Sequence, residues 1–135
     1  MELYIGGYAQ GKLAYVLREK KLAEEAVING AEFVWKKEKG LSAEKQIFND
    51  FERWVRKEIE SEKTSQTEPV ENQIKELIEE NPGLLVISDE VGNGIVPLEP
   101  LEREYRERLG RILCFLAERA DRMERILCGV GQRLK

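Results

Sequence analysis

The sequence predicts an α/β fold, a three-layer sandwich with a mostly parallel sheet. Short β-prone runs alternate with segments of helical periodicity along the 135 residues. Such alternation favours parallel strands that are joined by right-handed crossovers. One run, residues 84–87, is apolar throughout, as strands are when helices cover both faces of a parallel sheet. The length suits a single domain over residues 1–135.

The first predicted elements are a strand, a loop and a helix. Residues 3–5 form a short β-prone run that ends in two glycines, and apolar residues then recur at helical spacing over residues 12–22. A second strand is predicted at residues 26–28, before an Asn-Gly pair. Residues 33–35 are an alternative, since this apolar run would extend or replace that strand.

The middle of the chain predicts a long amphipathic helix. Ser42 is a candidate helix cap. Apolar residues follow at helical spacing, namely Ile47, Phe48, Phe51, Trp54, Val55 and Ile59. This pattern places Trp54 in the core, whereas it leaves open whether Trp35 is buried or exposed. Residues 61–69 are polar and contain no aliphatic side chain, so we expect an exposed connection there.

The second half predicts a helix, a strand, a helix and a strand. A short helix over residues 70–78 should end before an Asn-Pro-Gly sequence. The apolar strand at 84–87 follows. Residues 98–123 then have one apolar helix face among many charged positions, and a last strand at 126–128 leads into Gly-Val-Gly.

Composition excludes several classes of partner. The 22 basic and 26 acidic side chains give a formal net charge of -4, which exerts no general attraction on nucleic acid or an anionic membrane. Cys114 and Cys128 form no C-x-x-C pattern and the chain has no histidine, so a common zinc site is not expected. We predict that both thiols are reduced and buried. No basic leader and no apolar run of roughly 18 residues are present, which predicts a cytoplasmic protein without a membrane span.

The first strand-to-helix turn carries a phosphate-loop pattern. Gly6, Gly11 and Lys12 occupy the positions of G-x-x-x-x-G-K, directly after a strand and before a helix. In such a loop, backbone N–H groups and the positive end of the helix dipole face an anion. The candidate nucleotide-binding residues are Gly6, Gly7, Tyr8, Ala9, Gln10, Gly11, Lys12 and Leu13.

Position 13 departs from this motif. The usual Ser or Thr binds Mg²⁺ through its hydroxyl, whereas Leu13 offers no oxygen. The remaining half of the motif favours phosphate binding over turnover. The alternative is that the glycines only shape a tight turn and that Lys12 is a solvated surface lysine.

Two acidic residues, Asp89 and Glu90, follow the apolar strand. Ligands of open parallel sheets gather beyond the carboxyl ends of the strands. A carboxylate there can organise Mg²⁺ or its water shell across from a phosphate loop. We therefore predict Asp89 and Glu90 as metal-binding residues, and Lys12 and Glu90 as the residues that would support catalysis. The alternative is that both acidic side chains face water.

These acids begin a longer pattern. Residues 89–97 read Asp-Glu-Val-Gly-Asn-Gly-Ile-Val-Pro. This resembles the Asn-Glu-Val-Gly-x-Gly-Ile-Val-Pro segment of the adenosylcobinamide kinase/adenosylcobinamide-phosphate guanylyltransferase family of cobalamin assembly and salvage. Further positions resemble that family's next helix and closing strand, namely Leu101, Arg103, Tyr105, Arg106, Glu107, Gly110, Leu116, Ala117, Ala120, Asp121, Gly129, Leu134 and Lys135. The resemblance is strong over residues 84–135, moderate over residues 1–20 and visible only in outline between them.

The resemblance implies a P-loop NTPase-like (RecA-like) fold, ATP or GTP with Mg²⁺ as cofactor, a corrinoid substrate and a homo-oligomer. Family members transfer the guanylyl group through a histidine, which this chain lacks. Leu113 and Cys114 also replace an Asn-Gln pair of the family. The resemblance therefore implies a shortened, degenerate member without guanylyltransferase activity and with weak or no kinase activity. The alternative is a non-catalytic interaction or regulatory subunit that keeps the family scaffold.

Overall fold

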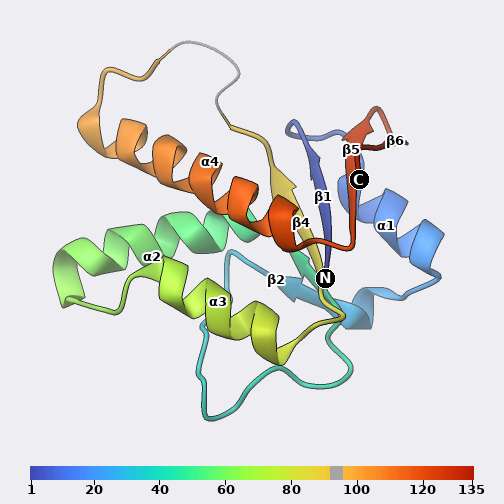
Figure 1. Cartoon of the computed structure of the whole chain (residues 1–135), viewed down its shortest axis with the longest axis horizontal. Helices are drawn as coiled ribbons and strands as arrows, with labels where there is room; N and C mark the ends of the chain where they lie inside the picture. Colours follow the sequence, from blue (N-terminus) through green and yellow to red (C-terminus); the bar gives the residue numbers. More distant parts are fainter. Residues whose placement is uncertain (92–95) are drawn as a thin grey trace.

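In the part of the chain that the structure describes, the sheet has six strands in the order β2-β3-β4-β1-β5-β6 (Figure 1). The computed structural model describes residues 1–91 and 96–135. In chain order, its strands are β1 (Glu2–Gly6), β2 (Val27–Asn29), β3 (Ile47–Asn49), β4 (Leu85–Asp89), β5 (Arg122–Leu127) and β6 (Val130–Arg133), and its helices are α1 (Lys12–Lys20), the short 3₁₀ turn η1 (Glu24–Ala26), α2 (Phe51–Ser65), α3 (Val70–Glu80) and α4 (Pro100–Arg119).

The strand pairing is mostly parallel. β1 lies at the centre and pairs in parallel with β4 and with β5, while β3 pairs in parallel with β2 and with β4. Among the described strands, only β6 runs the other way, as the second strand of a hairpin with β5. The predicted α/β fold with a mostly parallel sheet is confirmed.

Helices cover both faces of the sheet, which gives three layers. Successive residues of β1 point to opposite faces, so Leu3 packs in one apolar cluster with α2, α3 and α4, whereas Tyr4 packs in another with Val16 of α1. Figure 1 shows the same division, with α2, α3 and α4 on one side of the sheet and α1 on the other. Because both sides are covered, β4 is buried through most of its length.

The prediction of a long helix after Ser42 is wrong for the first part of that segment. Ile47 and Phe48 form β3, and the helix begins only at Phe51. The two side chains pack on opposite faces of the sheet, Ile47 with the α1 layer and Phe48 with the α2 layer. Their spacing to Phe51 also fits a helix, so the sequence pattern alone did not separate the two structures. Asp50, with a left-handed φ of 53°, makes the break between strand and helix.

Other boundaries also differ from the prediction. Helix α2 continues through Ser65, so the connection to α3 is shorter than residues 61–69. Residues 33–35 form no strand, and Trp35 is partly buried against the core. Helix α4 ends at Arg119, which leaves room for β5 to begin before the predicted last strand.

The prediction that both cysteines are buried is wrong, because both are exposed as free thiols. Cys114 lies on the outer side of α4, between the inward-facing Ile112 and Leu116. Cys128 lies in the β5–β6 turn, where its φ of 49° is left-handed. None of the helices in the described part of the chain could span a membrane.

Candidate functional site

The predicted phosphate loop connects β1 to α1 and has the backbone that such a loop requires. Gly11 is the N-cap of α1 with a φ of 78°, a conformation that favours glycine. A Cβ at Gly6 would lie 2.5 Å from the carbonyl oxygen of Ile126, so only glycine fits there without a backbone shift. No side chain of the described residues caps α1, so the first N–H groups of this helix have no such acceptor at the cap.

Lys12 is the buried cation of this loop. It is only 9% exposed, and its Nζ donates to the carbonyl oxygen of Gly7 at 2.7 Å and to Oδ1 of Asp89 at 2.6 Å. β1 and β4 are adjacent with Gly6 opposite Asp89, which brings these distant residues together. The alternative reading of Lys12 as a solvated surface lysine is therefore wrong.

The two acidic residues that were predicted to bind a metal ion have different partners in the structure. Asp89 reaches Lys12, whereas Glu90 accepts a hydrogen bond from Nε of Arg125 at 2.7 Å. Neighbouring residues of an extended strand end point in opposite directions, and this explains the separation. Residues 92–95 of the family-like segment lie outside the described residues.

A pocket of about 220 Å³ lies beside the loop. Its lining residues come from the loop and the start of α1, from the end of β3, from the start of α2 and from the end of β4: Tyr8, Ala9, Gln10, Gly11, Lys12, Leu13, Ala14, Asn49, Asp50, Glu52, Arg53 and Asp89. Sequence reasoning predicted the loop and Asp89 but missed the β3–α2 side. A strand that ended at Asn49 would have indicated it, because the carboxyl ends of neighbouring parallel strands lie at one edge.

Glu52 is a buried carboxyl group that lines the pocket. It is 7% exposed, and its Oε2 accepts the backbone N–H of Asp89 at 3.1 Å. Burial raises the pKa of Glu52, and the nearby charges of Asp89 and Asp50 raise it further, while the backbone hydrogen bond opposes the change. The ionised form of Glu52 therefore costs stability in the folded protein.

Glu52→Gln is expected to raise the melting temperature at pH 7 by a few degrees. The amide oxygen can still accept the Asp89 N–H, and the buried charge is removed. Because the folded pKa is raised, the cost of Glu52 diminishes as the pH falls through that pKa and disappears below the unfolded value. Calorimetric melting at pH 7 and pH 4 should show a gain that shrinks with acid. Glu60→Gln, in an exposed part of α2, is the control, and equal or lower stability of Glu52→Gln at pH 7 would contradict the argument.

The β5–β6 turn holds the loop from the other side. The N–H of Gly129 donates to the carbonyl oxygen of Gln10 at 2.8 Å, and the N–H of Cys128 donates to Oε1 of Gln10 at 2.8 Å. Gln10 is thus held by the turn, whereas the neighbouring Tyr8 is 78% exposed. These contacts fix the loop backbone before any ligand is bound.

The residues fit a phosphate better than an independently held metal ion. Lys12, the uncapped start of α1 and the left-handed Gly11 are the features that bind phosphate oxygens. Among the residues that the structure describes, no three Asp, Glu, Cys or His side chains are grouped so as to hold a metal ion. Leu13 lines the pocket without offering an oxygen.

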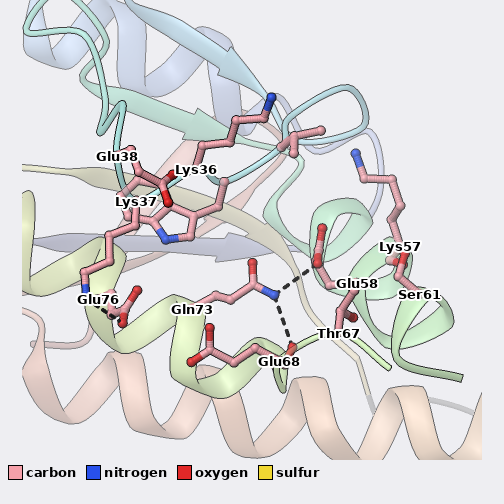
Figure 2. A pocket seen from close by; sticks show the side chains of 12 residues that line it. Lys36, Lys37, Glu38, Lys57, Glu58, Ser61, Thr67, Glu68, Gln73 and Glu76 are labelled. Atoms are coloured by element: carbon pink, nitrogen blue, oxygen red, sulfur yellow. Dashed lines mark hydrogen bonds and ion pairs between the residues drawn. The ribbon is translucent and has the colours of Figure 1, made fainter. Parts of the chain in front are cut away.

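A larger hollow of about 680 Å³ lies between residues 34–38, α2 and the start of α3. Figure 2 shows that several of its polar side chains bind one another. Nε2 of Gln73 donates to Oε2 of Glu58 at 3.1 Å and to the carbonyl oxygen of Glu68 at 3.3 Å, and Lys37 pairs with Glu76 at 3.1 Å. The hollow shares no lining residue with the loop pocket, and its paired charges indicate no particular ligand.

The fold is that of a P-loop NTPase-like α/β protein. The model of the family described as "Cobinamide kinase / cobinamide phosphate guanyltransferase" matches residues 19–134, and the chain belongs to this family. The predicted family resemblance is confirmed, and with it a relation to cobalamin biosynthesis and to nucleoside triphosphates. The match begins after the phosphate loop, so the function of that loop rests on its geometry. A search of curated proteins found no significant match.

Proposed function

We propose that the chain is a cobinamide kinase-like protein that binds the phosphates of ATP or GTP at the loop of residues 6–13. The observation that carries this proposal is Lys12, a buried lysine at the start of an uncapped helix and at the edge of a pocket. A phosphate group would take the place of Gly7 and Asp89 as a partner of its Nζ. Lysine is a common phosphate-binding residue in such loops because its ammonium group acts as a point charge.

The size of the pocket agrees with a phosphate ligand. At about 220 Å³, it is smaller than the roughly 300–1,000 Å³ of sites that enclose a drug-sized molecule. It can hold a phosphate chain, while the ribose, the base and any corrinoid would lie outside it. Binding of the nucleotide would thus depend mainly on the phosphates and on the charges around them.

We further propose that the chain does not transfer guanylyl groups and has weak or no kinase activity. It has no histidine to form a guanylylated intermediate. Leu13 lacks the hydroxyl that usually binds Mg²⁺ in a phosphate loop. Asp89 remains the candidate metal-binding residue in the pocket, and Glu90, which is paired with Arg125, would act only through a rearrangement of that pair.

A second candidate function is a non-catalytic interaction subunit. It is favoured by apolar side chains around the β5–β6 hairpin, where Leu127, Val130 and Leu134 are each more than half exposed. β6 is also the edge strand of the sheet, and exposed edge strands can pair with another chain. Assembly through this edge would give the homo-oligomer that the family resemblance implies.

Lys12→Ala is expected to weaken the binding of ATP or GTP roughly 10–100-fold, as loss of a hydrogen bond to a charged group predicts. Isothermal titration calorimetry of each nucleotide with Mg²⁺ would measure the change. Lys39→Ala, which removes an exposed lysine outside the pocket, is the control of equal charge. A melting curve of each variant would separate loss of binding from loss of folding.

The outcomes distinguish the two candidate functions. Binding that depends on Lys12 supports the nucleotide-binding proposal, and a phosphoryl-transfer assay with cobinamide would then measure any remaining kinase activity. No binding of either nucleotide by the folded wild-type chain would refute it. An oligomer that is unaffected by Lys12→Ala, measured by analytical ultracentrifugation, would then favour the interaction subunit.

A further inference from the structure

Arg53 is a second cation at the loop pocket, and the sequence motif does not account for it. It is the third residue of α2 and lines the pocket together with Lys12. Its backbone N–H donates to the carbonyl oxygen of Asp50 at 3.0 Å. Its guanidinium, in contrast, makes no hydrogen bond or ion pair in the described part of the chain. It is exposed and free to meet a ligand at the pocket.

The neighbouring arginines differ from Arg53 in this respect. Arg56, one helical turn further along α2, forms an ion pair with Glu102 and lies over the ring of Tyr105. Arg125, next to the loop, pairs with Glu90. Arg53 has acidic neighbours too, but Glu52 is turned inward to the N–H of Asp89. An arginine without a protein partner at a pocket is available for an anion, since its fork of N–H donors matches phosphate oxygens.

The pocket needs positive charge beyond that of Lys12. Asp50, Glu52 and Asp89 all line it and would repel a phosphate chain. In many phosphate loops Mg²⁺ offsets this repulsion and is held by the hydroxyl that follows the lysine. Leu13 takes that position here, so the usual metal contact is missing while the need for a second cation remains.

Two helices, α1 and α2, begin at residues that line the pocket. Residues 11–14 at the start of α1 line it, and so do Asn49, Asp50, Glu52 and Arg53 at the start of α2. Within residues 1–91 and 96–135, neither helix has a side-chain hydrogen bond at its N-cap. The positive ends of both helix dipoles thus favour an anion between Lys12 and Arg53.

We propose that Arg53 binds the phosphate chain opposite Lys12 and replaces the charge of the magnesium ion, so that a diphosphate group binds without a divalent metal. This inference rests on the proposed nucleotide-binding function. It adds that the ligand is recognised as a metal-free polyphosphate, and it assigns a binding role to a residue outside the loop motif.

Inorganic pyrophosphate is the probe that tests this inference, titrated calorimetrically in EDTA and again with Mg²⁺. The wild-type chain should bind it in both conditions with dissociation constants within about threefold of each other, and Arg53→Gln should weaken metal-free binding roughly tenfold or more. Arg53→Lys should restore part of the affinity, because it returns the charge without the fork of donors. Arg111→Gln, which removes a 68% exposed arginine of α4, should bind like the wild type.

The failures of the two proposals give different results. Two results would overturn the role of Arg53 and leave the proposed function standing. One is that pyrophosphate binds only with Mg²⁺. The other is that Arg53→Gln leaves binding unchanged while Lys12→Ala abolishes it. No binding of pyrophosphate in either condition by the folded wild-type chain would overturn both. A melting curve of Arg53→Gln that matches the wild type would show that its effect is on the ligand.

Discussion

Trp54→Ala is expected to lower the free energy of unfolding by about 3–5 kcal/mol, the range for truncating a large buried aromatic side chain. Trp54 is fully buried and lies at the centre of an aromatic cluster, with its ring centroid 5.3 Å from that of Phe48 and 5.6 Å from those of Phe33 and Phe51. These rings connect α2 to β3 and to the segment before it. Urea denaturation followed by circular dichroism would measure the change.

Trp54→Phe is the matched variant, and it should cost clearly less than Trp54→Ala. The indole Nε1 of Trp54 is buried and has no hydrogen-bond partner among the residues that the structure describes, so phenylalanine loses volume but no polar interaction seen there. A cost of Trp54→Phe equal to that of Trp54→Ala would contradict the expected benefit of keeping an aromatic ring here, and a cost below about 1 kcal/mol for Trp54→Ala would contradict its central place in the core. The cluster also supports the pocket, since Phe51 and Trp54 flank the positions of Glu52 and Arg53 on α2.

Arg108→Ala is expected to lower the free energy of unfolding at pH 7 by about 3 kcal/mol, because it leaves partly buried carboxylates without their cation. Arg108 on α4 is 13% exposed. It donates to both oxygens of Glu62 at 2.6 and 2.9 Å and to both oxygens of Glu71 at 3.0 and 2.7 Å. One guanidinium thus connects the end of α2, the start of α3 and the middle of α4. The expected loss is at the lower end for a buried pair, since Glu71 is 40% exposed to screening solvent.

The effect of Arg108→Ala should depend on pH. The hydrogen bonds from Arg108 hold the pKa of Glu62 and that of Glu71 below the ordinary value of 4.5. Carboxyls with lowered folded pKa values contribute stability above the unfolded pKa, and this stability is lost as the pH falls through the folded values. The difference between the wild type and Arg108→Ala should therefore be full at pH 7 and shrink once the pH falls below about 4.5. Urea midpoints measured between pH 3 and pH 7 would test this.

Arg111→Ala is the control for Arg108→Ala on the same helix. Arg111 pairs with Glu107 at 2.8 Å, but both side chains are more than two-thirds exposed. Exposed pairs of this kind contribute about 0–1 kcal/mol, so the variant should have nearly wild-type stability. Equal losses for the two arginine variants, or an Arg108→Ala loss that does not change with pH, would refute the view that Arg108 joins the three helices.

The local patterns of the sequence predicted a large part of the fold and half of the site. The apolar run at 84–87 predicted β4, the glycine pattern predicted the loop before α1, and residues 89–135 indicated the family that the comparison then showed. These signals are readable because they depend on neighbouring residues. A strand covered on both faces needs a continuous apolar run, and a phosphate loop needs glycines at fixed positions.

The other half of the site depends on contacts between distant segments. Ile47 and Phe48 have a spacing that fits a helix, and only their pairing with β4 makes them a strand. That strand brings Glu52 and Arg53 to the pocket and thus supplies the side that the sequence did not predict. Lys12 and Arg108 likewise bind carboxylates that are distant in the sequence, Asp89 for the first and Glu62 and Glu71 for the second. The alternation of elements, the loop and the family could thus be predicted from local patterns of residues. Which charges meet could not, because burial and ion pairing arise only when separate elements pack together.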